Sequence, residues 1–277
     1  MPGSSGARPE IHWFYMKILT CLKQVPARDS QLKIDNAARG LDESDLTFEM
    51  NEPDAYALEE ALQLKEALRL KGTPGVEVVA LCAGPERAAS SIRESLAKGA
   101  DRAIHIECDD LAAWDGLGVA RLLAAAARQE QPDLILTGLQ SDDLGLGQTG
   151  VILAELLGYA HASLVMAVEV TGSGLRVKRE LEDGWFQHVD LPLPAVLTIQ
   201  SGGNRLRYAT LMGIKKARTK ELKAVSVSDL AVANEATALA ERIYAPNKAK
   251  QTVMLTGTAK EQAMQLVEKL KFEARVF

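Results

Sequence analysis

The sequence is poor in cysteine and contains no long uninterrupted apolar segment. Its three cysteines, Cys21, Cys82 and Cys108, are scattered, and none belongs to a Cys-x-x-Cys pair. This spacing excludes a disulfide framework and a cysteine-based zinc site. Cys21 and Cys82 lie in or beside apolar runs, so we expect buried thiols, as in a reducing compartment. No run reaches the length of a membrane span, and no membrane insertion is expected.

A basic excess is also lacking. The formal net charge is −5 over 277 residues, whereas domains that bind nucleic acids usually carry excess Lys and Arg to neutralise phosphates. We therefore expect no nucleic-acid partner. Hydrophobic residues make up 47% and charged residues 25%, the balance of an ordinary globular protein with a sizeable core.

Signatures of hydrolytic catalysis are missing as well. The sequence has neither a Gly-x-Ser-x-Gly nor a His-Glu-x-x-His motif. Its histidines fall in predicted strands, in a hairpin or near the N-terminus, without an evident nucleophile to serve. We predict no catalytic residue and no metal site, so the chain is interpreted as a binding or carrier protein.

The first fifteen residues, MPGSSGARPEIHWFY, combine small and polar residues with an aromatic patch and have no apolar core of secretory length. We interpret 1–15 as a tag or a loose extension outside the fold. Because no targeting signal is recognised, a cytoplasmic location is expected.

From Met16 to about residue 200, short apolar runs alternate with amphipathic segments. Ala57, Ala61, Leu64 and Leu68, for example, recur at steps of four, three and four and share one helix face. The predicted strands are 17–22, 76–82, 102–106, 133–138, 162–170 and 195–200, and the predicted helices are 53–71, 86–98, 117–129 and 147–158. This alternation is typical of an α/β protein with three α/β/α layers and a mostly parallel sheet.

Other segments break this rhythm. Residues 24–48 predict a long loop or a short hairpin, and 175–191 predict a β-hairpin with an Asp-Gly turn. Residues 201 to about 257 lack the alternation and carry a basic cluster, and a final amphipathic helix is predicted at about 258–271. We interpret 16–200 as the globular domain. The remainder is expected to be a loop and an extended arm that packs on a partner chain.

The segment GLQSDDLGLGQTG, residues 138–150, connects a predicted strand to a helix. Ligands of open α/β sheets bind beyond the carboxyl ends of strands. Glycines let this backbone turn tightly and present N–H groups, and the helix dipole adds to an anion site that suits a phosphate. The loop residues predicted to bind a nucleotide are Gly138, Gln140, Asp142, Asp143, Gly145, Gly147, Gln148 and Thr149.

Two features leave this prediction open. Asp142 and Asp143 would repel an adjacent phosphate, so they are expected to cap the turn or to contact ribose hydroxyls. The pattern is neither Gly-x-Gly-x-x-Gly nor a P-loop, so a glycine-rich connection that binds nothing is the alternative.

Further residues are expected at the same edge of the sheet. Cys21 closes the first strand, Ala83 follows the second, and the Asn51–Asp54 turn begins the first helix. Asn51 also suits a simple helix cap, and both roles stay open. The run Ser201-Gly202-Gly203 resembles the pyrophosphate loop of ATP-cleaving enzymes, but it follows the last core strand, and a plain turn is the preferred interpretation.

Seven segments share a pattern with one known family. They are KILTCLKQVP (17–26), ALEEALQLKE (57–66), LAKGADRAIHI (96–106), GLQSDDLGLGQTG (138–150), LPAVLTIQ (193–200), RYATLMGIKKA (207–217) and EKLKFEARVF (268–277). Together they resemble the electron-transfer flavoprotein β subunit, including its nitrogen-fixation-associated homologues, from Met16 to the end. The 207–217 motif is the most specific, because no general feature of α/β folds requires it.

The resemblance implies a fold similar to adenine-nucleotide α-hydrolases and a heterodimer with an α subunit that holds the redox-active FAD. It implies that electrons pass from an acyl-CoA-type dehydrogenase through FAD to a quinone-linked oxidoreductase. In the ordinary branch of the family, the β subunit binds AMP as a structural ligand. That pocket carries over to Cys21, the Asn51–Asp54 turn, Ala83 and the Gln140–Thr149 loop.

In the bifurcating branch, a second FAD takes the AMP position. Here the loop departs from the common Gln-Ala-Ile-Asp pattern, and Glu52 interrupts the usual Asn-Pro pair. Lys-Gln-Val-Pro at 23–26 and Asp54 resemble bifurcating members, whereas Gln-Thr-Gly at 148–150 resembles AMP-binding ones. We expect AMP, with a second FAD as the alternative.

In the family, the loop around Leu211 is a recognition loop that places a leucine in an apolar pocket of partner dehydrogenases. The resemblance implies that 201–217 is this loop and that 218–277 is an arm on the α subunit. The apolar tip would be formed by Tyr208, Leu211, Met212 and Ile214. Neighbouring lysines would steer the encounter. A core position for Leu211 is the competing interpretation.

Two unrelated functions compete with this one. A standalone nucleotide-binding protein of the universal-stress type has a similar sheet, but it would form a homodimer and have no need for 201–277. An ATP-cleaving ligase or hydrolase would need a phosphate loop after the first strand, and residues 23–30 contain no glycine.

Overall fold

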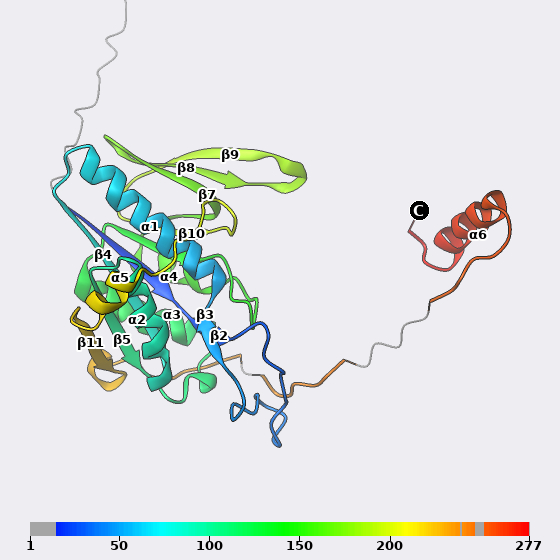
Figure 1. Ribbon diagram of the computed structural model, residues 1–277, viewed down its shortest axis with the longest axis horizontal. Helices are drawn as coiled ribbons and strands as arrows, with labels where there is room; N and C mark the ends of the chain where they lie inside the picture. The colour runs from blue at the N-terminus through cyan, green and yellow to red at the C-terminus, as the bar shows by residue number, and fades with distance from the viewer. Residues whose placement is uncertain (1–14, 239, 247–251, 277) are drawn as a thin grey trace, which may run out of the picture. The chain divides into compact units, whose positions relative to one another are not determined.

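The computed structural model of the chain describes residues 15–238, 240–246 and 252–276. The chain forms two compact units, one that reaches Glu241 and one that begins at Arg242. In the first unit, nine strands of the described residues form one sheet in the order β11-β5-β4-β1-β6-β10-β7-β8-β9 (Figure 1). The pairs from β11 to β7 are parallel, and β7, β8 and β9 are antiparallel.

The strands of this sheet are β1 (Tyr15–Leu22), β4 (Gly75–Gly84), β5 (Arg102–Glu107), β6 (Leu134–Gly138), β7 (Ala160–Thr171), β8 (Gly174–Glu180), β9 (Phe186–Leu191), β10 (Ala195–Ile199) and β11 (Leu222–Ser226). A small second sheet pairs β2 (Gln24–Pro26) with β3 (Phe48–Met50). The helices are α1 (Glu52–Leu70), α2 (Ala89–Lys98), α3 (Gly116–Glu130), α4 (Thr149–Leu157), α5 (Leu211–Ala217) and α6 (Ala259–Phe272). Short 3-10 turns lie at Glu86–Ala88, Leu111–Ala113, Glu182–Gly184 and Ser228–Leu230.

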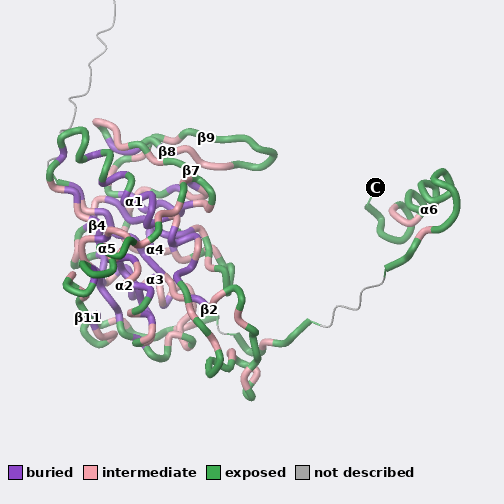
Figure 2. The backbone as a smooth tube through the Cα atoms, viewed as in Figure 1, coloured by how far each residue is buried: buried purple, intermediate pink, exposed green. Residues whose placement is uncertain are grey.

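Helices cover both faces of the parallel part of the sheet. Alternate strand residues divide between the faces, so that Ile18 packs with α1 and α2, whereas its neighbour Leu19 packs with α3 and α4. The continuous apolar runs of the central strands follow from this double burial. Figure 2 shows the buried residues gathered in the interior between the layers. The predicted three-layer α/β/α fold with a mostly parallel sheet is therefore confirmed.

Strand β11 was missed by the sequence interpretation. It pairs in parallel with β5 at the edge of the sheet, and only Val225 of its five residues is buried. A short edge strand with so few buried residues leaves no clear period in the sequence. Strand β11 lies within the first compact unit, which reaches Glu241.

Smaller differences concern element ends. Both alternatives for 24–48 are present, because β2 and β3 pair and the residues between them form a long loop. Strand β1 begins at Tyr15, and the rest of the expected N-terminal extension lies outside the described residues. Helix α4 begins at Thr149, two residues later than predicted, because Gly147 has a φ of 63° and Gln148 takes the N-cap position.

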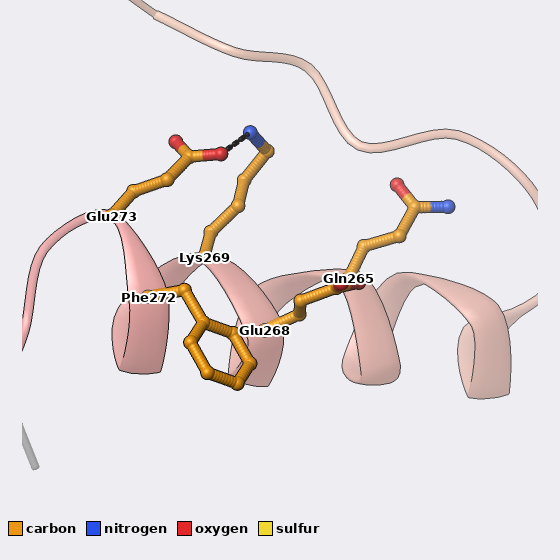
Figure 3. A pocket seen from close by; sticks show the side chains of 5 residues that line it. All are labelled: Gln265, Glu268, Lys269, Phe272 and Glu273. Carbon is orange, nitrogen blue, oxygen red and sulfur yellow. Dashed lines mark hydrogen bonds and ion pairs between the residues drawn. The ribbon is translucent and has the colours of Figure 1, made fainter.

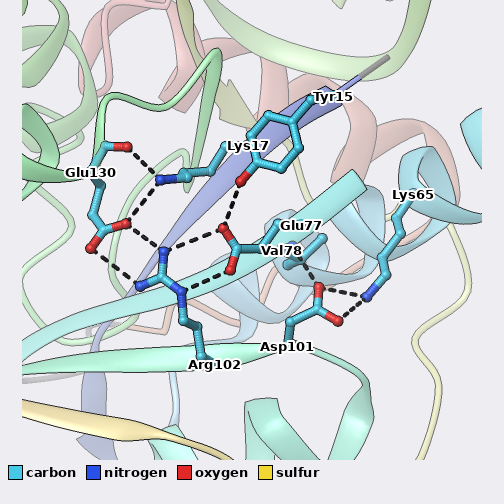
Figure 4. Close-up of polar contacts among 8 residues, drawn as sticks. All are labelled: Tyr15, Lys17, Lys65, Glu77, Val78, Asp101, Arg102 and Glu130. Atoms are coloured by element: carbon cyan, nitrogen blue, oxygen red, sulfur yellow. Dashed lines mark hydrogen bonds and ion pairs between the residues drawn. The ribbon is translucent and has the colours of Figure 1, made fainter. Parts of the chain in front are cut away.

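Ion pairs close the amino-terminal edge of the sheet. Arg102 at the start of β5 bonds Glu77 of β4 at 2.8 Å and Glu130 at the end of α3 at 2.5 Å. Lys17 of β1 also reaches Glu130, and the Tyr15 hydroxyl donates to Glu77 (Figure 4). These contacts tie three neighbouring strands to a helix end, which leaves the opposite, carboxyl edge for a ligand.

Among the residues that the structure describes, no helix combines the length and the apolar character needed to cross a membrane.

Candidate functional site

The sheet order creates a topological switch point at the carboxyl edge. Strand β1 lies between β4 on one side and β6 on the other, and the chain continues from β1 toward β4, so β1 and β6 flank a topological switch point. Crevices at such points are the usual ligand sites of open α/β sheets. Cys21 near the end of β1, Ala83 near the end of β4 and Gly138 at the end of β6 all lie at this edge.

A buried carboxylate joins the ends of β1 and β6. Asp54, in the first turn of α1, is 7% exposed. One of its oxygens accepts from the Lys23 N–H at 2.8 Å, and the other accepts from the Gly138 N–H at 2.9 Å. Burial raises the pKa of Asp54 to about 7, although both N–H bonds favour the charged form and limit the rise. Asp54 therefore links the residue that follows β1 to the end of β6, and both of its carboxylate oxygens accept hydrogen bonds from the protein itself.

Gly138 is required by close approach and not by a tight turn. The positive φ expected for a turning glycine is absent here. A side chain at this position would place its Cβ 2.5 Å from the Asp54 carboxylate and 2.7 Å from the backbone of Pro53. The N-terminus of α1 can reach β6 only because residue 138 has no side chain.

Asn51 stands at the N-cap position of α1, but its side chain makes no capping hydrogen bond. Instead, its amide donates to the Gln140 carbonyl at 3.1 Å and accepts from the Asp142 N–H at 2.9 Å. The interpretation of Asn51 as a simple cap is therefore wrong. Asn51 fixes the backbone of the 138–150 loop against α1.

Basic side chains neutralise the acidic pair in the loop. Lys23 donates to Asp143 at 2.7 Å, and Arg28 pairs with Asp142 at 3.3 Å and with Glu52. Burial raises the pKa of Asp143, but the Lys23 ammonium and its hydrogen bond outweigh this and leave that pKa below its ordinary value. Lys23 and Arg28 were missing from the predicted site. The position of Lys23 directly after the first strand was the available signal.

The end of the loop presents backbone donors. Gly145 and Gly147 have φ values of 64° and 63°, a conformation that glycine adopts without strain. Within the described residues, the N–H groups of Gly147, Gln148 and Thr149 have no hydrogen-bond partner. They stand at the N-terminus of α4, where unpaired N–H groups and the helix dipole favour an anion. The loop geometry thus suits a phosphate at this point.

Cys21 and Ala83 contribute packing at the edge of the crevice. Both are buried in the apolar cluster shared with α3 and α4. Burial raises the pKa of the Cys21 thiol, so it stays protonated and neutral. Gln140 and Gln148 are exposed on the loop, which leaves their amides available to a ligand.

A second exposed feature lies at 207–217. This segment includes α5, which is capped by Thr210 through the Gly213 N–H at 3.0 Å. Tyr208 is 91% exposed and Leu211 is 88% exposed, with Met212 at 61% and Ile214 at 46%. The competing interpretation, in which Leu211 is a core residue, is wrong. All four predicted apolar side chains are exposed, three of them on α5 and Tyr208 just before it.

A shallow hollow lies on α6 in the second unit (Figure 3). Its lining comes from this one helix and its end, and the Lys269–Glu273 ion pair of 2.8 Å spans part of it. The lining residues are Gln265, Glu268, Lys269, Phe272 and Glu273. None of them belongs to the predicted nucleotide site.

Known proteins are similar to this chain over most of its length. The family profile described as the electron transfer flavoprotein domain matches residues 39–230. The protein "Electron transfer flavoprotein subunit beta" of Methylophilus methylotrophus is 37% identical over 261 residues, which cover 91% of this chain and 97% of that protein. The proteins of the same name in Bradyrhizobium diazoefficiens and Homo sapiens are 36% and 34% identical, cover 94% of this chain, and are themselves covered to 100% and 99%. The chain therefore belongs to the electron-transfer flavoprotein β-subunit family.

Proposed function

We propose that this chain is the β subunit of a heterodimeric electron-transfer flavoprotein. An α subunit would hold the FAD, which accepts electrons from one partner and delivers them to another. Electrons would come from a dehydrogenase of the acyl-CoA type and leave to a quinone-linked oxidoreductase. The observation that carries this proposal is the exposed apolar surface of Tyr208, Leu211, Met212 and Ile214, together with family membership.

The β subunit would act as a scaffold and a docking subunit. A single large apolar side chain on a short helix suits a small interface that forms and dissociates quickly. Lys215 and Lys216 are exposed and form no ion pair in the described part of the chain, so they would steer an acidic partner face. The proposed docking site is a binding surface, and we assign no catalytic residue to it.

A nucleotide would occupy the crevice beside the 138–150 loop. The unpaired N–H groups from Gly147 to Thr149 would hold its phosphate, and the pairing of Asp142 and Asp143 with basic side chains lowers the repulsion that a phosphate would meet. We propose AMP as a structural ligand. A second FAD in the same position is the alternative. It is favoured by the Lys23–Pro26 segment and Asp54, which resemble the bifurcating members of the family.

The second unit would pack on the α subunit. None of the described residues of α6 is buried within its own unit, and Met264, Val267 and Phe272 are 61%, 52% and 66% exposed. The helix is nevertheless well formed, with a capping box between Thr258 and Glu261. A stable helix with an uncovered apolar surface is expected to be covered by a partner. A cytoplasmic location is proposed for the complex.

The experiment is co-expression of the chain with an electron-transfer flavoprotein α subunit, followed by acid extraction of bound nucleotides. The expected product is a yellow heterodimer with one FAD and one AMP. Two FAD and no AMP would make the bifurcating variant the better reading. A colourless homodimer that ignores the α subunit would contradict the proposal and favour a universal-stress-type protein.

A further inference from the structure

The 207–217 segment is anchored on α1 by one arginine. Arg207 donates to Glu59 through Nε at 2.8 Å and through Nη2 at 3.0 Å, and to Glu66 through Nη1 at 2.7 Å. The Glu59 side chain is 5% exposed, so the Glu59 carboxylate of this cluster is shielded from water. Burial raises the pKa of Glu59, but the bonds from Arg207 and Gln63 outweigh it, and the pKa lies below its ordinary value.

The far end of the segment is anchored on α2. Just after the segment, Lys220 donates to the Leu96 carbonyl in the last turn of α2 at 2.9 Å, where helix carbonyls lack helical partners, and to the Ala100 carbonyl just past the helix at 2.5 Å. In the reverse direction, Arg93 of α2 donates to the Ala217 carbonyl at 2.9 Å. Cations at a helix C-terminus also interact favourably with its dipole. The end of α5 is therefore tied to the end of α2.

The middle of the segment rests directly on the α2 backbone. A Cβ built on Gly213 would lie 2.3 Å from the Ala97 carbonyl oxygen. Only glycine permits this approach, and Figure 1 shows α5 beside α2. Three points of attachment thus hold a segment whose outer surface is almost entirely exposed.

This combination matters for a small interface. Ordering a flexible loop costs conformational entropy, and that cost is subtracted from the binding free energy if the loop becomes ordered only at the encounter. A segment that is already fixed in the folded protein avoids it. Leu211, at 88% exposure, has no packing of its own to hold it in place, so its position depends on the anchors.

We propose that Arg207 is a positioning residue for docking: its bonds to Glu59 and Glu66 hold the 207–217 segment in the conformation in which Leu211 meets the donor dehydrogenase. The inference rests on the proposed function and adds to it the residue that acts through Leu211. Arg207 itself does not contact the donor in this account.

The test uses the FAD-loaded heterodimer and an acyl-CoA dehydrogenase that reduces the wild type in the presence of its acyl-CoA. Arg207→Ala is expected to raise the KM for the heterodimer about fivefold, which corresponds to about 1 kcal/mol, and to leave kcat within about twofold. Arg207→Lys keeps the charge but cannot bond both carboxylates in a fork, so an intermediate KM is expected. Arg176→Ala removes an exposed arginine–carboxylate pair on the β8–β9 hairpin and should leave KM unchanged.

A double-variant cycle separates positioning from general stability. If Arg207 acts through Leu211, then Arg207→Ala should raise KM much less in a Leu211→Ala background than in the wild type. Fully additive effects would overturn the inference, and so would a KM increase that simply follows loss of bound FAD. Should Arg207→Ala fail to assemble, Glu66→Gln decides, with about a twofold rise in KM expected and no change contradicting the role.

Different results would contradict the docking function and the positioning role of Arg207. If Leu211→Ala leaves the KM for the heterodimer unchanged, the proposed docking function is wrong. If Leu211→Ala raises that KM and Arg207→Ala does not, the docking function stands and only the positioning role of Arg207 is overturned.

Discussion

The 138–150 loop and the 207–217 segment are both exposed and both held by α1, but by different means. The loop is held through its backbone, because Asn51 and Asp54 bond its N–H and carbonyl groups. The contact of the 207–217 segment with α1 is made by a side chain, Arg207, which pairs with carboxylates on that helix. One helix thus supports a loop that offers backbone groups and a segment that offers side chains.

The difference follows from what each region must present. A phosphate is bound by several N–H groups at fixed spacing, so the backbone itself needs to be immobile. An apolar docking surface tolerates small movements of its side chains, and partly exposed ion pairs suffice to hold it. Buried bonds to a carboxylate contribute about 1.5–3 kcal/mol each, whereas exposed ion pairs contribute about 0–1 kcal/mol. We therefore expect the two regions to respond very differently to substitution.

The largest effect is expected for Asp54→Ala. Removal of this carboxylate leaves the N–H groups of Lys23 and Gly138 without partners in a buried place, at a cost of about 3 kcal/mol in the free energy of unfolding. Urea unfolding of the heterodimer measures it, and the bound nucleotide should be lost as well. Asp190→Ala, which removes an exposed partner of Arg176, is the control with little change. Equal free energies of unfolding for Asp54→Ala and Asp190→Ala would contradict this expectation.

The same residue predicts a pH dependence. The pKa of Asp54 rises from 3.8 in its ordinary state to about 7 on burial. Between these values the folded chain holds a proton that the unfolded chain has lost, so this group makes the free energy of unfolding fall as pH rises and level off above about 7. Asp54→Asn should remove this component between pH 5 and pH 8 in urea unfolding of the heterodimer. An identical slope in wild type and variant would contradict it.

Asn51→Ala tests whether backbone hydrogen bonds hold the 138–150 loop in place. Loss of two hydrogen bonds to Gln140 and Asp142 should cost about 1–2 kcal/mol and should lower the affinity for the nucleotide, because the loop backbone is released. Equilibrium dialysis of the heterodimer with AMP measures the affinity. Asn234→Ala removes a comparable but exposed amide, which donates to the Ala113 carbonyl, and should leave affinity as it was. Equal affinity in both variants would show that Asn51 does not hold the site.

The smallest effect is expected at the lysines that follow Leu211. Lys215→Gln with Lys216→Gln should lower kcat/KM for the donor about twofold to threefold at low ionic strength, and the difference should vanish at high salt, because screening removes steering. Lys33→Gln, which alters an exposed lysine in the 27–47 loop, serves as the control. A loss that persists at high salt would mean that these lysines make close contacts.

Sequence periodicity was sufficient for the central fold. Strands such as 76–82 are buried on both faces, so their apolar runs are unbroken and their type is unambiguous. Strand β11 was not predicted from the sequence, because it lies at the edge of the sheet and Val225 is its one buried residue. Its membership in the sheet is decided by pairing with β5, in which Leu222 lies beside Ala103, 119 positions earlier in the chain.

The candidate site was predictable in place but not in its contacts. The carboxyl edge and the glycine loop follow from the order of strands and helices. The pairing of Lys23 with Asp143 joins residues 120 positions apart, and no local pattern encodes it. Asn51 illustrates the limit, since a helix-cap position was evident and the direction of its side chain was not.

The exposed surface around Leu211 is proposed to dock an electron donor. The most direct measurement is the steady-state reduction of the FAD-loaded heterodimer by an acyl-CoA dehydrogenase, for Leu211→Ala and for Leu70→Ala, a leucine that is 90% exposed on α1. We expect kcat/KM to fall about tenfold for Leu211→Ala, equivalent to about 1.4 kcal/mol, with bound FAD and heterodimer content retained. Leu70→Ala should match the wild type. Equal kinetics for the two variants would contradict the claim.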